Sequence, residues 1–239
     1  AVLASAGLAG GFTMPQAVGA FIACAALIVL VDSHCHLDAG EFDPDRAQVI
    51  ARARAAGVMA QVVPAVTAAS WPKLREVCLQ APRLYPAYGL HPVFLAEHTR
   101  EHVDELRQWI DRERPCAIGE CGLDFNRDFS PRPQQEKVLE EQLALAVELQ
   151  LPVFLHERDA TERLLAILRE FRDQLPAAVV HCFTGDQRSL FGYLDLDLYI
   201  GITGWICDER RGSHLHPLLR EIPSQRLMLE SDAPFLLPR

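Results

Sequence analysis

The stretch L-I-V-L-V-D-S-H-C-H, residues 27–36, begins as an apolar run and ends in polar side chains. The whole apolar run covers residues 17–31, which is short for a transmembrane helix. No Lys or Arg precedes Arg46, so the run also lacks the basic start of a secretory signal peptide. We therefore expect a buried parallel strand near residues 27–33.

Similar short runs, rich in apolar and β-branched residues, recur along the chain and predict seven further strands. Their starts are 21 to 37 residues apart, which is the length that one strand and one helix require. The eight expected strands lie near residues 27–33, 58–64, 84–89, 115–120, 152–156, 177–181, 198–203 and 226–231. Amphipathic segments between them predict helices over residues 45–56, 102–113, 134–150 and 160–174. This alternation favours an α/β fold of the (β/α)8 TIM-barrel type; a doubly wound open sheet is the alternative.

The length of 239 residues fits one such domain. We assign the barrel to residues 23–239 and treat residues 1–22 as an uncharged N-terminal extension of uncertain status. The sequence ends at Arg239, shortly after the eighth expected strand, so we expect a barrel without its C-terminal closing helix.

Composition narrows the classes of function. An apolar content of 49% with 23% charged residues is ordinary for a globular protein. The net charge of −9 argues against a broad basic surface for DNA, so contact with nucleic acid would be local. Seven cysteines without a C-x-x-C pair indicate reduced thiols rather than a disulfide framework. We expect a cytoplasmic protein with no membrane partner, and a monomer.

Five of the expected strands end in His, Asp or Glu, at the face where TIM barrels carry their chemistry. One such residue alone is more often a packed core histidine or a helix cap. Together they would be costly to bury unpaired, and metal coordination would satisfy all of them. The six candidate ligands are His34, His36, Glu120, His156, His181 and Asp232.

The spacing His34-x-His36 places both imidazoles on one face of an extended chain. Imidazole and carboxylate ligands together suit Zn²⁺, Mn²⁺ or Mg²⁺. Six ligands are too many for one tetrahedral zinc and suit two divalent ions that share a carboxylate. Paired ions of this kind are typical of enzymes that displace phosphoryl groups.

The motifs around these residues resemble the TatD family of metal-dependent deoxyribonucleases, a group of amidohydrolase-like barrels. They run in order from about residue 27 to residue 239. The matching segments are D-S-H-C-H-L-D (32–38), G-L-H-P (89–92), I-G-E-C-G-L-D-F (118–125), P-V-F-L-H-E-R-D-A (152–160), V-H-C-F-T-G (180–185), Y-I-G-I-T-G (199–204) and L-E-S-D-A-P (229–234).

The resemblance implies a role for each candidate ligand. His34, His36 and Asp232 would hold a first metal, and Glu120 would bridge to a second. His156 and His181 would complete the second site.

The resemblance also implies groups that act on the substrate. Asp232 would orient or deprotonate the attacking water, while His91 and Arg158 would contact the scissile phosphate. The implied activity is hydrolysis of DNA, often by an exonuclease, and we expect single strands or strand ends as the substrate.

Several alternatives remain open from the sequence. Arg127, Arg210 and Arg211 in loops would bind flanking phosphates or be solvated charges, and Trp205 would stack on a base or pack in the core. Other chemistries are amide or ester hydrolysis of the amidohydrolase type and deacylation of D-aminoacyl-tRNA. A non-catalytic metal protein is disfavoured, because structural zinc sites are usually closed and rich in cysteine.

Overall fold

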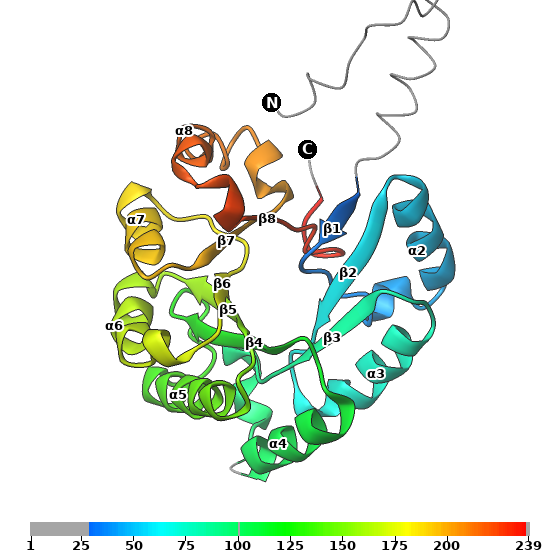
Figure 1. Cartoon of the computed structure of the whole chain (residues 1–239), viewed down its shortest axis with the longest axis horizontal. Coiled ribbons are helices and arrows are strands. Elements are labelled where there is room, and N and C mark those ends of the chain that lie inside the picture. The colour runs from blue at the N-terminus through cyan, green and yellow to red at the C-terminus, as the bar shows by residue number, and fades with distance from the viewer. Residues whose placement is uncertain (1–28, 100, 238–239) are drawn as a thin grey trace, which may run out of the picture.

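The chain forms a ring of eight parallel strands surrounded by helices. The computed structural model describes residues 29–99 and 101–237, and the expected extension over residues 1–22 lies outside them. The strands follow the chain order around one sheet (Figure 1): β1 Leu30–Asp32, β2 Val58–Pro64, β3 Leu84–Tyr88, β4 Ala117–Asp124, β5 Val153–Arg158, β6 Ala178–Val180, β7 Tyr199–Ile202 and β8 Leu227–Leu229. The predicted TIM barrel is confirmed. The doubly wound alternative is wrong, because the strand order never reverses.

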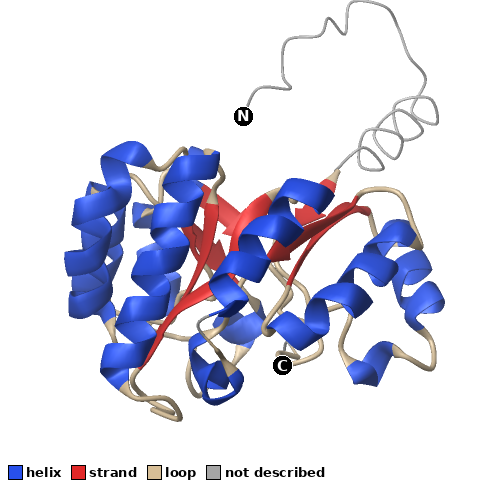
Figure 2. Ribbon diagram, turned by 90° about the horizontal axis from the view of Figure 1, so that it is seen from below, coloured by secondary structure: helices blue, strands red, loops and turns tan. Residues whose placement is uncertain are grey.

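The helices lie outside the ring and cover the strands, as Figures 1 and 2 show. They bury one apolar stripe each, for example Leu164, Ile167 and Leu168 on α6. Their bounds are α2 Arg46–Ala55, α3 Trp71–Leu79, α4 Glu101–Glu113, α5 Arg132–Leu149, α6 Thr161–Phe171, α7 Gln187–Asp195 and the short α8 Leu215–Leu218. Among the described residues no helix follows β8, and none is long and apolar enough to cross a membrane.

The interior of the ring is filled by a small cluster that is separate from the main core. Ala87, Ala117, Phe154 and Val179 belong to β3, β4, β5 and β6, and all are buried. Phe154 also meets the ring of His34 edge to face, with 6.0 Å between the ring centroids. This cluster therefore forms an apolar layer beneath His34.

Polar contacts join β8 to β1 where the ring closes. The Ser33 amide donates to the Leu229 carbonyl at 2.9 Å, and the Asp232 amide donates to the His34 carbonyl at 2.9 Å. The Asp32 carboxylate accepts hydrogen bonds from the Ser231 amide at 2.9 Å and from its hydroxyl at 2.6 Å. The seam between the last and first strands thus brings the residues after both strands together.

Two strands run past their predicted ends. β4 continues beyond Glu120 to Asp124, and β5 continues beyond His156 to Arg158. The pairing between them is irregular between Ile118 and Cys121 and then resumes up to Asp124. The sequence predicts a strand end at Glu120, whereas in the structure Gly119 lies in the irregular stretch and Gly122 pairs with His156 in a continuous, fully buried strand.

Gly122 allows β4 and β5 to approach each other closely. Its φ is +141°, a conformation that side chains rarely adopt. A Cβ atom at this position would lie 2.0 Å from the carbonyl oxygen of His156. Glycine is therefore required here for the strand pair that carries Glu120 and His156.

We predict that Gly122→Ala lowers the free energy of unfolding by about 3 kcal/mol or more, because backbone strain and a backbone clash add together. Urea denaturation followed by circular dichroism measures the change. Gly40→Ala is the matched control, since the nearest atom to its added Cβ is 4.0 Å away. Equal stability of the two variants would contradict this account of β4.

Candidate metal centre

The six candidate ligands, distant in sequence, lie together at the carboxyl ends of the strands. They come from five parts of the ring: His34 and His36 follow β1, Glu120 lies in β4, His156 in β5, His181 follows β6 and Asp232 follows β8. All are buried or nearly so, and the side chain of His34 has no exposed surface.

Glu120 lies at the middle of this group and its two carboxylate oxygens face different partners. Oε2 is 3.3 Å from Nε2 of His34 and 3.7 Å from Nε2 of His36. Oε1 is 3.1 Å from Nδ1 of His156 and 3.4 Å from Nε2 of His181. Oε2 thus faces the two imidazoles that follow β1, and Oε1 faces His156 and His181 together with His91, at 3.3 Å. Imidazoles on both oxygens are the arrangement that a bridging carboxylate needs.

Asp232 joins the pair of histidines on the Oε2 side. Its Oδ1 lies 3.4 Å from Nε2 of His36 and 4.0 Å from Nε2 of His34. The two histidine nitrogens are themselves 3.3 Å apart. Ligand atoms of His34, His36 and Glu120 all lie within 4.8 Å of one another. Convergence of so many lone pairs in a buried space fits divalent cations.

Two carboxylates that the sequence analysis did not assign hold the histidines in orientation. Nε2 of His156 lies 3.0 Å from Oδ2 of Asp124, so its Nδ1 faces Glu120. Nδ1 of His181 lies 3.3 Å from Oε2 of Glu230, and its Nε2 faces Glu120. Carboxylates behind ligating histidines fix the ring orientation and raise its basicity. Both residues stand inside the quoted motifs, which was the available signal.

His91 contacts Glu120, and with Glu120 and His156 it forms a group whose ligand atoms lie within 4.8 Å of one another. In the absence of metal its ring is placed to donate a hydrogen bond. Its Nδ1 accepts a hydrogen bond from the Val93 amide at 3.1 Å. In the neutral ring the proton is then on Nε2, which lies 3.3 Å from Oε1 of Glu120. Burial lowers the pKa of His91 to about 4, so the ring is neutral at pH 7. A neutral N–H donor suits contact with a phosphoryl oxygen.

The structure does not bring Arg158 into contact with the six ligands. Its guanidinium lies 5.1 Å from the centroid of the Trp205 ring, and it forms no ion pair within the described part of the chain. It lines a hollow of about 330 Å³ between the loops that follow β5 and β6. An unpaired guanidinium at the barrel mouth remains available to a phosphate.

The loop after β7 carries the other candidate substrate contacts. Arg210 and Arg211 both pair with the buried Asp208, at 3.0 and 2.9 Å. Trp205 packs against the core and lies 4.0 Å from the Arg211 guanidinium, measured to the ring centroid. Core packing, one of the two interpretations of Trp205, therefore describes its surroundings. Arg127 lies in the exposed loop after β4.

Comparison with known proteins agrees with the geometry. A family model described as TatD related DNase matches residues 31–239. The chain belongs to this family. A protein named 3'-5' ssDNA/RNA exonuclease TatD from Rahnella sp. (strain Y9602) is 48% identical over 206 residues, which cover 85% of this chain and 78% of that protein. Its namesake in Dickeya dadantii (strain 3937) is 47% identical, covering 88% of this chain and 80% of that protein.

Solved structures give the same result. The TatD homologue YJJV from Escherichia coli K12 superposes with a TM-score of 0.81 and 34% identity, covering 86% of this chain and 79% of that one. The predicted family membership is confirmed, and the chain is a metal-dependent hydrolase with candidate His and Glu clusters for metal.

The buried carboxylates and imidazoles of this TatD-family centre shift one another's pKa values. Burial raises the pKa of Glu120, but the positive charges of His91, His181 and His34 outweigh it and hold the pKa well below the usual range. Burial likewise lowers the pKa of His181, yet the charges of Glu120 and Glu230 raise it to about 9. In the metal-free chain, therefore, a proton on His181 occupies the place where a cation would bind.

We predict that metal affinity rises between pH 6.5 and 9, by about tenfold per pH unit for each proton displaced. In the metal-free chain, the raised pKa of His181 contributes stability that is fully present below pH 6.5 and lost as the pH rises through about 9. Metal replaces that proton, so its stabilising effect grows over the same window. Calorimetric titration with Mn²⁺ and thermal unfolding across this range measure both effects, and a flat affinity would contradict the assignment.

We also predict that Asp124→Asn weakens metal binding about 10- to 100-fold. The amide retains Oδ1, which accepts from the Asn126 and Arg127 amides, but its NH₂ donates to Nε2 of His156. The ring proton then moves to Nδ1, which must be free of a proton to bind metal. Calorimetry with Mn²⁺ tests this. Asp128→Asn, in the exposed part of the same loop, is the control and should bind as the wild type does.

Proposed function

We propose that this protein is a two-metal exonuclease that removes nucleotides from the 3' ends of single-stranded DNA or RNA. The observation that carries the proposal is the position of Glu120, whose Oε2 faces His34 and His36 while its Oε1 faces His156 and His181. The relatives that are 47–48% identical over most of the chain are named as 3'-5' ssDNA/RNA exonucleases, which supports this substrate class.

Six residues would hold the two ions. His34, His36 and Asp232 would form the first site, His156 and His181 the second, and Glu120 would bridge them. When bound, divalent ions of the Mg²⁺, Mn²⁺ or Zn²⁺ type supply Lewis acidity that lowers the pKa of water and offsets charge on phosphoryl oxygens.

The side chains around the ligands have roles of their own. Asp232 would orient the attacking water and accept its proton. Burial raises the pKa of Asp232, but the hydrogen bond with His36 and the charges of His181 and His34 outweigh burial and hold the pKa below its usual value. The carboxylate is therefore ionised and able to accept a proton. The Nε2–H of His91 would donate to a phosphoryl oxygen, and Arg158 would bind the phosphate from the other side.

The charge of the whole chain fits a local mode of binding. With a net charge of −9, attraction of the strand depends on arginines at the barrel mouth, such as Arg158, and on the bound cations. A short strand end reaches such a site more readily than a long duplex does. We propose a cytoplasmic monomer, in keeping with the dispersed free cysteines of the described residues.

We predict that Glu120→Gln lowers the rate of DNA hydrolysis by about 10³-fold or more while the barrel remains folded, because the bridging charge is lost. A 3'-labelled single-stranded oligonucleotide with Mg²⁺ or Mn²⁺ measures release of mononucleotides, and circular dichroism measures folding. Glu209→Gln, an exposed residue in the loop after β7, is the control and should keep the wild-type rate. Wild-type activity in Glu120→Gln would refute the proposal. So would release of amino acid from charged D-aminoacyl-tRNA with no cleavage of DNA.

A further inference from the structure

A second feature at the mouth of the barrel is a hollow of about 280 Å³ between the loops that follow β2 and β3. We call it the Phe94 pocket. It is lined by Thr67, Leu90, His91, Phe94, His98 and His102, together with other residues of the same loops and of α4. Its volume suits a group of the size of a nucleobase rather than a stretch of chain.

The Phe94 pocket is continuous with the metal centre through His91. Nε2 of His91 is 3.3 Å from Glu120, while the same ring lies 4.4 Å from that of His156 and 5.7 Å from that of Phe94, measured between centroids. A phosphate that contacts His91 would thus have its neighbouring nucleoside beside Phe94. No bound metal is needed for this placement.

The aromatic wall of the pocket offers a stacking surface. Phe94 is 42% exposed, although its neighbours Val93 and Leu95 are buried. The exposed part of the ring is therefore available to a ligand. Stacking of a base on an aromatic side chain is worth about 1–3 kcal/mol and does not depend strongly on which base it is.

Polar atoms in the pocket match the edge of an uncharged base. Nδ1 of His98 is buried and has no hydrogen-bond partner within the described residues. Nδ1 of His102 accepts from the Thr99 amide at 3.2 Å, which leaves the neutral ring with a donor at Nε2. Burial lowers the pKa of His98, so this ring is neutral at pH 7. The carboxylates of Glu97 and Glu105 at the rim would repel a phosphate but not a base.

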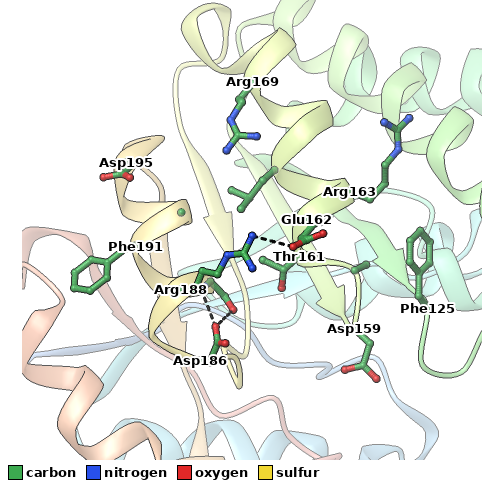
Figure 3. A pocket seen from close by; sticks show the side chains of 14 residues that line it. Phe125, Asp159, Thr161, Glu162, Arg163, Arg169, Asp186, Arg188, Phe191 and Asp195 are labelled. Carbon is green, nitrogen blue, oxygen red and sulfur yellow. Dashed lines mark hydrogen bonds and ion pairs between the residues drawn. The ribbon is translucent and has the colours of Figure 1, made fainter.

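Another groove of the molecule does not offer this chemistry. A hollow of about 1070 Å³ lies outside the barrel between α6 and α7 (Figure 3). There Arg188 is paired with Glu162 at 3.0 Å, and Arg163 is paired with Glu136 at 2.8 Å. Two of its arginines are thus paired with carboxylates, and none of the metal-centre residues lines it.

We propose that the Phe94 pocket binds the base of the terminal nucleotide, the one that the reaction releases. The inference rests on the proposed function and adds a subsite to it. The rest of the strand would leave on the opposite side of the centre, past Arg158. A base-sized pocket on one side and an arginine-bearing hollow on the other would favour cleavage one nucleotide from an end.

Binding of the released product tests the pocket without catalysis. In calorimetric titrations with Mn²⁺ present, wild-type protein should bind deoxyadenosine 5'-monophosphate about 5- to 100-fold more tightly than deoxyribose 5-phosphate, which has no base. Phe94→Ala should lose most of this difference while its affinity for deoxyribose 5-phosphate stays unchanged. Phe191→Ala is the matched control: Phe191 is 39% exposed but lies on α7, and the difference should persist.

Equal affinities of the two ligands for wild-type protein would overturn the inference, and this comparison does not depend on any variant folding. Phe94→Leu, which keeps apolar volume but removes the ring, should also lose most of the difference; full retention there would likewise overturn it. Failure of the proposed function has a different signature, namely no cleavage of oligonucleotides by the metal-loaded wild type. If cleavage occurs but an abasic 3' terminus is removed as fast as a normal one, the pocket inference fails alone.

Discussion

The structure depends on one buried carboxylate, Glu120, which lies among five imidazole rings. An unpaired carboxylate at 2% exposure would be prohibitively unfavourable, and the rings provide the compensating interactions. Since those rings come from β1, the loop after β3, β5 and the loop after β6, the barrel must bring four separate segments to one point. The fold and the chemistry therefore share a single requirement, which is that these four segments are held together around Glu120.

The sequence was informative where chemistry and strand ends coincide. Alternation of apolar runs and amphipathic segments predicted the barrel, and the positions of His34, His156 and Asp232 relative to those runs predicted a shared site. The same reasoning placed the end of β4 at Glu120, because the close approach of β5 that lets the strand continue through Gly122 is seen only in the structure. The sequence alone does not distinguish a glycine required by the close approach of β5 from a glycine that ends a strand.

Residues that act through other residues were beyond reach of the sequence. Asp124 and Glu230 hold the far nitrogens of His156 and His181, and such contacts depend on the register between strands and on ring orientation. His91 was identified only through the resemblance to the TatD family, since a lone histidine after a buried strand is usually structural. Its Nε2 is a hydrogen-bond donor because its Nδ1 accepts from the Val93 amide, and residue spacing in the sequence does not predict this contact.

The seam between β8 and β1 has a consequence for how the molecule loses function on heating. Within the described residues no regular strand pairing joins β8 to β1; individual hydrogen bonds hold the seam, and one of them links the Asp232 amide directly to the His34 carbonyl. Local opening of a barrel begins where its strands are least joined. Such fraying would carry Asp232 away from the histidines while the remaining strands stay paired. Activity would then be lost at a lower temperature than the one at which the whole barrel unfolds. The stability of the β8–β1 seam, rather than that of the core, would set the highest temperature at which the enzyme works.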